Sequence, residues 1–351
     1  MDIYAFKDKF DVVLKKYVDE KIIQSKKLLT DEKLNKFVDY VSDFIFSGWK
    51  RIRPYCLRLT YKWYGWDNDE AIMKFGIIFE LLHSMALIHD DIIDKSQKRH
   101  NVLTMHAYIN SILGNSDKVW HISEWQAMLV WDLLLSWVYE LRYKNHDFSE
   151  EFLISARDNV HAMIEEVILG QMIDVDMMSS GPAKLDLIEK KNIYKTASYT
   201  FVRPMLTWAI LSWAIEQQKE YIWELAKNLW LAFQLRDDFF DITLGDKTKT
   251  MFSDIREGQQ TYFTNFIFEN WSEDQKNFLT KCMWSGDELT TNDIEKLQKL
   301  FSETGALEFG KELIKKYVNL SNEFLEKVDF ANQDCKIWLK SLIEKIGDRL
   351  I

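Results

Sequence analysis

Apolar residues return every three or four positions over long stretches of this chain, which is the spacing of one face of an α-helix. Two stretches show the pattern clearly: Ile77, Leu81, Met85, Ile88 and Ile92 in the first, and Leu129, Leu133, Trp137, Val138 and Leu141 in the second. Turn-forming residues are scarce, with 12 glycines and 3 prolines where average usage over this length would give roughly 40. Few turns leave little room for strands, so the pattern predicts an all-α-helical protein.

The predicted helices are separated by short breaks. These fall at 64–69, 114–118, 145–149, 179–183, 245–249 and 285–287. None is long enough for an interdomain linker, and the chain contains no internal repeat or low-complexity tract. We therefore expect one domain that spans residues 1–351, with 47% apolar residues to build a large core.

Charge and cysteine content exclude several classes of protein. Lys and Arg total 45 against 55 acidic residues, a net charge of −10, whereas a general nucleic-acid binder needs a basic stripe. The three cysteines form no CxxC pair and no basic leader opens the chain, so we expect a soluble, cytoplasmic protein without disulfides or structural zinc. No uninterrupted apolar run reaches the roughly 18 residues of a membrane span, because Glu80 and His83 break one run and Asp132 another.

Two clusters of aspartates share one spacing, DDxxD. They are Asp90, Asp91 and Asp94 in the first, and Asp237, Asp238 and Asp241 in the second. On a helix, residues i and i+4 lie one above the other, so each cluster directs two carboxylates the same way. Mg²⁺ prefers oxygen ligands and commonly shares them with substrate phosphates. Two solvated acidic faces would be the alternative, but the apolar neighbours of both clusters favour a metal site, since crowded like charges need a compensating cation.

Cationic residues accompany the first cluster. The segment 48–54 holds three of them, Lys50, Arg51 and Arg53, and such a group suits a diphosphate because guanidinium groups bind its oxygens in pairs. A basic helix start would have the same composition. His83 precedes the first cluster by two helical turns and Arg99 follows it by five residues. A lone histidine is more often a core residue than a ligand, so His83 gains meaning only from its neighbours.

In their order along the chain, these elements resemble the motifs of the trans-isoprenyl diphosphate synthases, also called the polyprenyl synthetase family. The matching elements are residues 48–54, 83–94, 170–174, 195–196 and 233–241, and the similarity extends to about residue 261. The resemblance implies an all-α, isoprenoid-synthase-type helical bundle around a deep central cavity. It also implies that the two aspartate clusters face each other across the mouth of that cavity.

The resemblance assigns roles to individual residues. The implied Mg²⁺ ligands are the six aspartates Asp90, Asp91, Asp94, Asp237, Asp238 and Asp241. The residues implied to bind the allylic diphosphate are Arg99, Lys195 and Lys249, and those for isopentenyl diphosphate are Lys50, Arg53 and His83. Further substrate contacts are implied for Gln171 and Phe233. The residues implied to act in catalysis are Lys195, Thr196, Gln234, Asp90 and Asp237.

The chemistry of such a reaction fits these residue types. Breaking an allylic carbon–oxygen bond leaves a delocalised cation and a diphosphate anion, which metal ions, Lys and Arg stabilise. The isopentenyl double bond attacks the cation and a proton is lost, so no protein nucleophile is needed. We therefore expect a Mg²⁺-dependent head-to-tail condensation of isopentenyl diphosphate with an allylic diphosphate, giving a longer trans-prenyl diphosphate. The family also implies a homodimer.

Two departures from the family pattern and one length signal refine this expectation. Arg99 is followed by His100 where a second arginine is usual, and Gln259 stands where a lysine is usual. In the family, bulky residues four and five positions before the first aspartate motif shorten the product. Those positions hold Ala86 and Met85, neither aromatic, so we expect geranylgeranyl diphosphate.

Three other interpretations remain open. A terpene cyclase would share the fold and first motif, but would have an Asn/Ser/Glu pattern in place of the second DDxxD and no isopentenyl site. A non-catalytic subunit of a heteromeric prenyl synthase would tend to lose aspartates, and all six are present. A plain helical protein with acidic faces would bind neither Mg²⁺ nor diphosphates.

Tryptophan is more frequent than glycine, with 14 Trp against 12 Gly. Nine of the tryptophans stand where glycine would be expected: Trp49, Trp66, Trp120, Trp125, Trp131, Trp208, Trp213, Trp230 and Trp284. Such bulk in packed helices costs ~1–3 kcal/mol per site. We hypothesise that a codon read as glycine in the source organism appears here as tryptophan. A core repacked around genuine tryptophans is the alternative.

Overall fold

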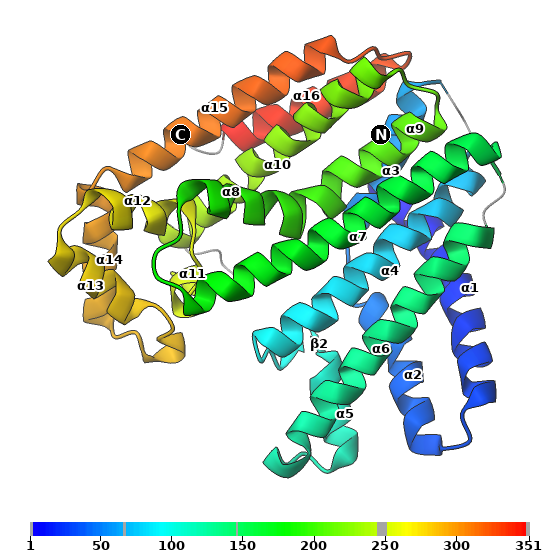
Figure 1. Cartoon of the computed structure of the whole chain (residues 1–351), viewed down its shortest axis with the longest axis horizontal. Coiled ribbons are helices and arrows are strands. Elements are labelled where there is room, and N and C mark those ends of the chain that lie inside the picture. The colour runs from blue at the N-terminus through cyan, green and yellow to red at the C-terminus, as the bar shows by residue number, and fades with distance from the viewer. Residues whose placement is uncertain (1–2, 66–67, 145–146, 244–250, 349–351) are drawn as a thin grey trace. The chain divides into compact units, whose positions relative to one another are not determined.

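The computed structural model describes residues 3–65, 68–144, 147–243 and 251–348, and these are almost entirely helical (Figure 1). The prediction of an all-α fold is confirmed. Helices begin or end within two residues of four predicted breaks, the break at 285–287 lies between two helices and holds a 3₁₀ turn, and the break at 245–249 lies outside the described residues. Further breaks, at 29–31, 46–51 and 328–332, were not predicted. The breaks at 29–31 and 328–332 contain neither glycine nor proline, so composition gave no signal for them, whereas Ser47-Gly48 in the break at 46–51 is a turn signal.

The chain falls into two compact units, which we describe one at a time. The first comprises residues 1–160 and 207–213. Its elements are α1 (Ile3–Leu28), α2 (Glu32–Ile45), α3 (Ile52–Trp63), α4 (Asp69–Ile93), β1 (Lys98–Arg99), β2 (Val102–Leu103), α5 (Met105–Leu113), α6 (Asp117–Lys144) and the beginning of α7 (Glu150–Ser179). The second comprises residues 161–206 and 214–351. The expectation of a single domain over 1–351 stays a prediction.

The second unit holds the rest of α7 and the elements that follow it. These are α8 (Leu185–Asn192), the π-helix η1 (Ile193–Val202), α9 (Arg203–Leu211, whose last residues belong to the first unit), α10 (Glu216–Thr243), α11 (Ser253–Arg256), α12 (Tyr262–Asn270), α13 (Glu273–Cys282), the 3₁₀ turn η2 (Gly286–Glu288), α14 (Thr291–Glu303), α15 (Ala306–Lys327) and α16 (Gln333–Asp348). Helix α10 packs against both α15 and η1, which places it at the centre of this unit.

Helix α4 is the core helix of the first unit. It packs against α3 and α6, and its buried residues occupy all sides of the helix, as in Phe75, Ile77 and Ile78. Among the described residues it is the one helix long and apolar enough to cross a membrane, and 83% of its most apolar window is buried inside the structure. Such burial is typical of a core helix, which is apolar all round because neighbours cover it all round. The expected cytoplasmic location stays a prediction.

The only strands in the described part of the chain form a two-residue antiparallel hairpin after α4. Lys98 pairs with Leu103 and Arg99 with Val102. His100, at the turn, has a φ of +52°. The hairpin reverses the chain just beyond the first aspartate cluster and so brings Arg99 back towards it.

Candidate active site

The first aspartate cluster lies at the carboxyl end of α4. Asp90 is half-buried, Asp91 is buried and Asp94 caps the helix as an exposed residue. The carboxyl end of a helix carries the negative pole of its dipole, so three carboxylates there are unfavourably placed. Arg99 offsets part of this repulsion. A cation bound at the cluster would offset the rest.

Asp91 connects the cluster to the hairpin. Its Oδ1 accepts a hydrogen bond of 2.8 Å from Nε of Arg99 and forms an ion pair with Nη2 of the same residue at 2.7 Å. Burial raises the pKa of Asp91 to about 6, although Arg99 acts to lower it. The other oxygen, Oδ2, is buried and has no hydrogen-bond partner among the described residues. A buried carboxylate oxygen without a donor fits a position close to a bound cation.

Cationic side chains gather around His83, two turns before the cluster on α4. Burial lowers the pKa of His83 well below its usual value, and the charges of Arg53, Arg99 and Arg51 lower it further. The imidazole is therefore neutral at pH 7. Three of the residues predicted to bind diphosphates thus come together in the first unit. Lys50, the fourth, is exposed in the segment before α3.

Trp49 occupies space beside this cationic group. Its ring packs edge-on against the rings of His83 and His100, with centroids 4.6 and 4.4 Å apart. A second tryptophan, Trp131, stacks on His89 at 4.4 Å, next to the first cluster. Two of the tryptophans suspected of replacing glycine therefore contact residues that precede or flank the predicted ligands.

The second aspartate cluster lies in the last two turns of α10, again at the carboxyl end of a helix. Asp237 is exposed, whereas Asp238 and Asp241 are buried. Burial raises the pKa of Asp238 to about 7, and the neighbouring aspartates add to the shift. Nε2 of Gln234 donates a hydrogen bond of 2.8 Å to Oδ1 of Asp238. Ionisation of Asp238 is thus opposed by its surroundings unless a cation compensates it.

Asp241 is held differently from its neighbours. Its Oδ1 accepts hydrogen bonds from the backbone N–H and the hydroxyl of Ser253, and its Oδ2 accepts one from the backbone N–H of Asp254. These amides open the short helix α11. The carboxylate therefore ties the start of α11 to the end of α10, and its orientation is fixed before any ligand arrives.

Lys195 and Thr196 lie in the π-helix η1. Wide i→i+5 turns are rare and occur mostly near functional sites. Helix α7 approaches η1 closely at Gly170, where a Cβ would lie only 2.3 Å from the backbone nitrogen of Lys195. Only glycine therefore fits at this crossing, which accounts for the glycine in the 170–174 motif. Gln171 is half-buried on the same helix.

Two lysines, the buried Lys191 and the half-buried Lys195, flank the buried Asp174, and the sequence identified only Lys195. Nζ of Lys195 lies 2.6 Å from Oδ2 of Asp174, and Nζ of Lys191 lies 3.3 Å from Oδ1. Burial acts to raise the pKa of Asp174, but the two ammonium groups outweigh it and hold the pKa below its usual value. Lys191 also donates to the carbonyl of Gln260 and favours ionisation of Asp238. A run of two lysines at 190–191 gave no sequence signal, because such runs usually mark solvated faces.

The remaining predicted residues have simpler surroundings. Phe233 is half-buried beside Trp230, with ring centroids 5.2 Å apart, and Thr196 is half-buried in η1. Met85 is buried in α4 and Ala86 is half-buried. Lys249 lies outside the described residues. That the two clusters face each other also stays a prediction.

The residues present fit magnesium better than a metal that is held by the protein alone. Among the described residues, no three carboxylate, imidazole or thiol groups converge into a complete metal cage. Mg²⁺ is usually bound by one or two carboxylates together with waters and substrate phosphates. The unpartnered Oδ2 of Asp91 and the raised pKa of Asp238 are consistent with such shared sites.

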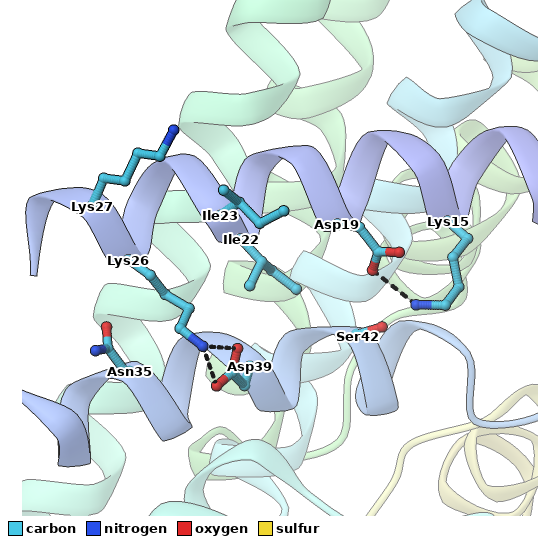
Figure 2. Close-up of a pocket in the computed structure, with 9 residues that line it drawn as sticks. All are labelled: Lys15, Asp19, Ile22, Ile23, Lys26, Lys27, Asn35, Asp39 and Ser42. Atoms are coloured by element: carbon cyan, nitrogen blue, oxygen red, sulfur yellow. Dashed lines mark hydrogen bonds and ion pairs between the residues drawn. The ribbon is translucent and has the colours of Figure 1, made fainter.

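A groove between α1 and α2 of the first unit, with a volume of about 670 Å³, contains none of the predicted residues. Two of its three lysines are already paired, Lys15 with Asp19 and Lys26 with Asp39, and Lys27 points away from them (Figure 2). The groove therefore lacks the converging cations that a diphosphate requires, and we do not regard it as a substrate site.

A family model described as polyprenyl synthetase matches residues 32–302, more than half of the chain. The chain belongs to the polyprenyl synthetase family. The family that the motifs predicted is thereby confirmed, and with it the prediction of a prenyltransferase.

Individual relatives of this polyprenyl synthetase agree. A short-chain isoprenyl diphosphate synthase of Methanocaldococcus jannaschii is 30% identical, with 78% of this chain and 75% of that protein covered. A geranylgeranyl diphosphate synthase of Methanosarcina mazei is 27% identical, with 95% and 94% covered. A crystal structure of a Corynebacterium glutamicum geranylgeranyl pyrophosphate synthase, complexed with isoprenyl diphosphate and magnesium, has a TM-score of 0.85 at 25% identity, with 99% of this chain and 100% of that chain covered.

Proposed function

We propose that this polyprenyl synthetase condenses isopentenyl diphosphate with an allylic diphosphate in a Mg²⁺-dependent reaction and releases geranylgeranyl diphosphate. The observation that carries the proposal is the placement of both DDxxD clusters at the carboxyl ends of helices, each with fixed cations near it. Helix dipoles disfavour this placement and a metal-bound diphosphate favours it.

The aspartates and Arg99 have different roles in this reaction. Asp90, Asp94 and the unpartnered Oδ2 of Asp91 would hold Mg²⁺ from the first cluster, and Asp237, Asp238 and Asp241 from the second. When bound, Mg²⁺ neutralises charge that develops on the departing diphosphate. Arg99, fixed by Asp91, supplies a guanidinium to the same anion.

Residues of the second unit act on the departing diphosphate and on the developing allylic cation. Asp174 holds the ammonium of Lys195 in place, so that it meets the diphosphate in a set position. Nε2 of Gln234 is committed to Asp238, which leaves its carbonyl oxygen to turn towards the developing allylic cation. The neutral imidazole of His83 can bind isopentenyl diphosphate only as a hydrogen-bonding group, so Lys50 and Arg53 provide the charge.

An assay with Mg²⁺, isopentenyl diphosphate and farnesyl diphosphate tests the proposal. We expect geranylgeranyl diphosphate as the main product and no turnover in excess EDTA. A terpene cyclase would instead convert the allylic diphosphate alone, and a non-catalytic subunit would consume neither substrate. Either result would contradict the proposed function.

The length of the product depends, in this proposal, on the buried residue Met85. Replacing it with phenylalanine adds bulk at a position that the family pattern assigns to the end of the product chain. We expect Met85→Phe to shift the main product from twenty to fifteen carbons, as resolved by chromatography. Met105→Phe, the same change at another buried methionine of the first unit, is the matched control and should leave the product unchanged. Equal products from Met85→Phe and wild type would show that residue 85 does not limit the chain.

A homodimer completes the proposal. Helix α6 exposes four large apolar side chains over two turns, namely Ile122, Trp125, Met128 and Leu129. A contiguous exposed apolar face is typical of a surface covered by a partner. Sedimentation of the purified protein would test this, with a monomer at micromolar concentration as the contrary result.

A further inference from the structure

Arg51 differs from the other cations of the segment 48–54. Lys50 is exposed and Arg53 is half-buried, whereas the Arg51 residue is only 2% exposed. Its backbone has a φ of +57°, in the left-handed region. A residue with a Cβ is strained there, and glycine or asparagine would be the usual choice. An arginine at this position therefore needs compensation from its side chain.

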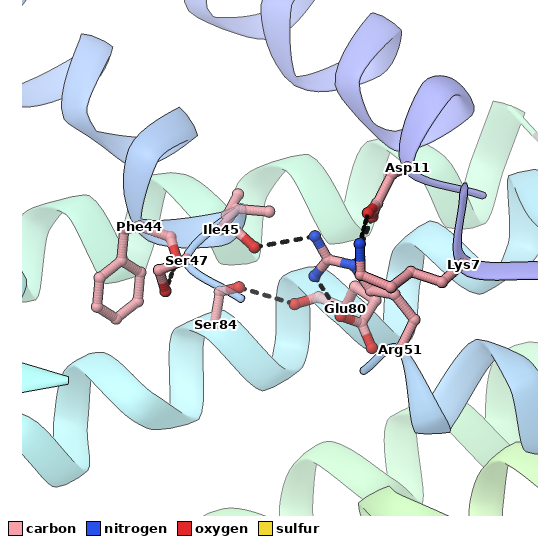
Figure 3. A network of polar contacts seen from close by, with 8 residues as sticks. All are labelled: Lys7, Asp11, Phe44, Ile45, Ser47, Arg51, Glu80 and Ser84. Carbon is pink, nitrogen blue, oxygen red and sulfur yellow. Dashed lines mark hydrogen bonds and ion pairs between the residues drawn. The ribbon is translucent and has the colours of Figure 1, made fainter. Parts of the chain in front are cut away.

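The guanidinium of Arg51 connects three helices of the first unit (Figure 3). Nε donates to Oδ1 of Asp11 in α1, and Nη1 donates to Oε2 of Glu80 in α4, both at 2.7 Å. Nη2 donates to the backbone carbonyl of Ile45 at the end of α2, at 3.0 Å. The guanidinium also lies over the ring of Phe46, 5.2 Å from its centroid.

Glu80 explains why this connection is specific. It is a carboxylate in the middle of the core helix α4 and only 1% exposed, which is costly for an acid without a buried cation. Its Oε2 is bound by Arg51. The planar fork of arginine serves Asp11, Glu80 and Ile45 at once, and the single ammonium of a lysine cannot reproduce that geometry.

The same network borders the predicted isopentenyl site. Glu80 precedes His83 by three residues, so both side chains lie on one face of α4. Arg51 and Arg53 both contribute to the positive field at His83. Arg51, which anchors the segment 48–54, is therefore part of the same cluster as the residues predicted to bind isopentenyl diphosphate.

We propose that Arg51 is a positioning residue for isopentenyl diphosphate. By binding Asp11, Glu80 and the Ile45 carbonyl, it holds the left-handed turn that presents Lys50 and Arg53 to that diphosphate, without touching the substrate itself. The inference rests on the proposed function, since it assumes that these two cations bind isopentenyl diphosphate.

Steady-state kinetics of Arg51→Lys test it. The lysine keeps a positive charge beside Glu80, so the protein is expected to fold. Because two of the three side-chain connections are lost, we expect the KM for isopentenyl diphosphate to rise about tenfold, with kcat and the KM for the allylic diphosphate within twofold of wild type. A second variant, Arg51→Met with Glu80→Met, removes both buried charges together and should show the same selective rise.

Arg58→Lys is the matched control. Arg58 of α3 also forms a two-pronged pair, with Asp69 at 3.1 and 3.0 Å, and lies over an aromatic ring, that of Phe6. The Arg58→Lys variant should leave the KM values for isopentenyl diphosphate and for the allylic diphosphate unchanged. Unchanged KM values in both folded Arg51 variants, or equal rises for the two substrates, would overturn the positioning role. A wild-type protein that neither binds nor consumes isopentenyl diphosphate would instead overturn the proposed function, and the inference with it.

Discussion

Asp90→Asn and Asp94→Asn are each expected to lower kcat by roughly 10³-fold, because metal stabilisation of a leaving diphosphate contributes several kcal/mol and each 1.4 kcal/mol corresponds to a factor of ten. The same variants should be at least as stable as the wild type. Both carboxylates lie at the negative pole of α4, where removing a negative charge is worth about 0.3–1 kcal/mol. Product formation under saturating Mg²⁺ and urea unfolding of each variant measure the two effects.

The opposite signs of these two effects separate a catalytic from a structural role. Activity lost together with stability would indicate that the cluster supports the fold, and activity retained would remove it from the reaction. Asp43→Asn is the control, since Asp43 is an exposed aspartate in the last turn of α2 and belongs to no motif. It should gain the same small stability and keep full activity. Carboxylates that cost stability but are needed for the reaction are an example of the general trade-off between stability and function.

The sequence predicted the parts of this protein that follow local rules. Helices could be recognised because their apolar faces repeat every 3.6 residues, as in α4 and α6. The aspartate clusters could be recognised because residues i and i+4 of a DDxxD lie on the same face of a helix. Arg53 and Arg99 could be recognised from their place in the motifs that resemble the family. What depended on distant contacts could not be predicted.

Three residues illustrate that limit. Composition groups Arg51 with Lys50 and Arg53, but only Arg51 is fully buried, because its acceptors come from α1, α2 and α4. Lys191 belongs to no recognised motif, and only the fold places it beside Asp174 of α7. The π-helix at Lys195 has no pattern of its own, since a few wide turns scarcely change the apolar spacing.

Two tryptophans at glycine-like positions have backbones that favour glycine. Trp213 follows the end of α9 and Trp284 follows the end of α13, and each has a φ of +66°. Residues just beyond a helix end commonly adopt this left-handed conformation and are commonly glycine. Both residues are largely exposed, at 64% and 55%, so the contacts of Trp213 with Phe152 and of Trp284 with Gly258 bury only part of each ring. Local geometry therefore supports the recoding hypothesis at these two sites.

Unpartnered indole N–H groups do not by themselves distinguish the suspected tryptophans, because Trp271, which is not a suspected site, also has one among the described residues. The indole N–H groups of Trp49, Trp131, Trp208 and Trp230 are buried and have no hydrogen-bond partner in the part of the chain that the structure describes. Each such donor costs about 1–3 kcal/mol. Trp120 differs, because its N–H donates to Glu124 at 2.9 Å. Trp125 lies exposed in the middle of α6, where nothing local favours glycine, and Trp66 lies outside the described residues.

Trp213→Gly and Trp284→Gly are each expected to raise the free energy of unfolding by about 1 kcal/mol, since a residue with a Cβ loses about 1–2 kcal/mol in the left-handed region and little burial is given up. Trp125→Gly is the control and should lower it by about 1 kcal/mol, because glycine is unfavourable inside a helix. Urea unfolding of the three variants and the parent measures these values. Destabilisation by all three would mean that the rings at 213 and 284 contribute more than their strained backbones cost.

Peptide mass spectrometry of the protein from its source organism then decides between recoding and repacking. A single reassigned codon would place glycine at 213 and 284 together with 49, 131 and 230, so that the rings beside His83, His89 and Phe233 would be absent from the natural enzyme. In that case the enzyme carrying glycine at these positions should also be the more active one, because the predicted substrate residues lose their aromatic cover. Tryptophan at 49, 131 and 230 in the native peptides would instead show that the core has repacked around genuine rings. A gain in stability from Trp213→Gly and Trp284→Gly would then say nothing about which residue the natural protein carries there.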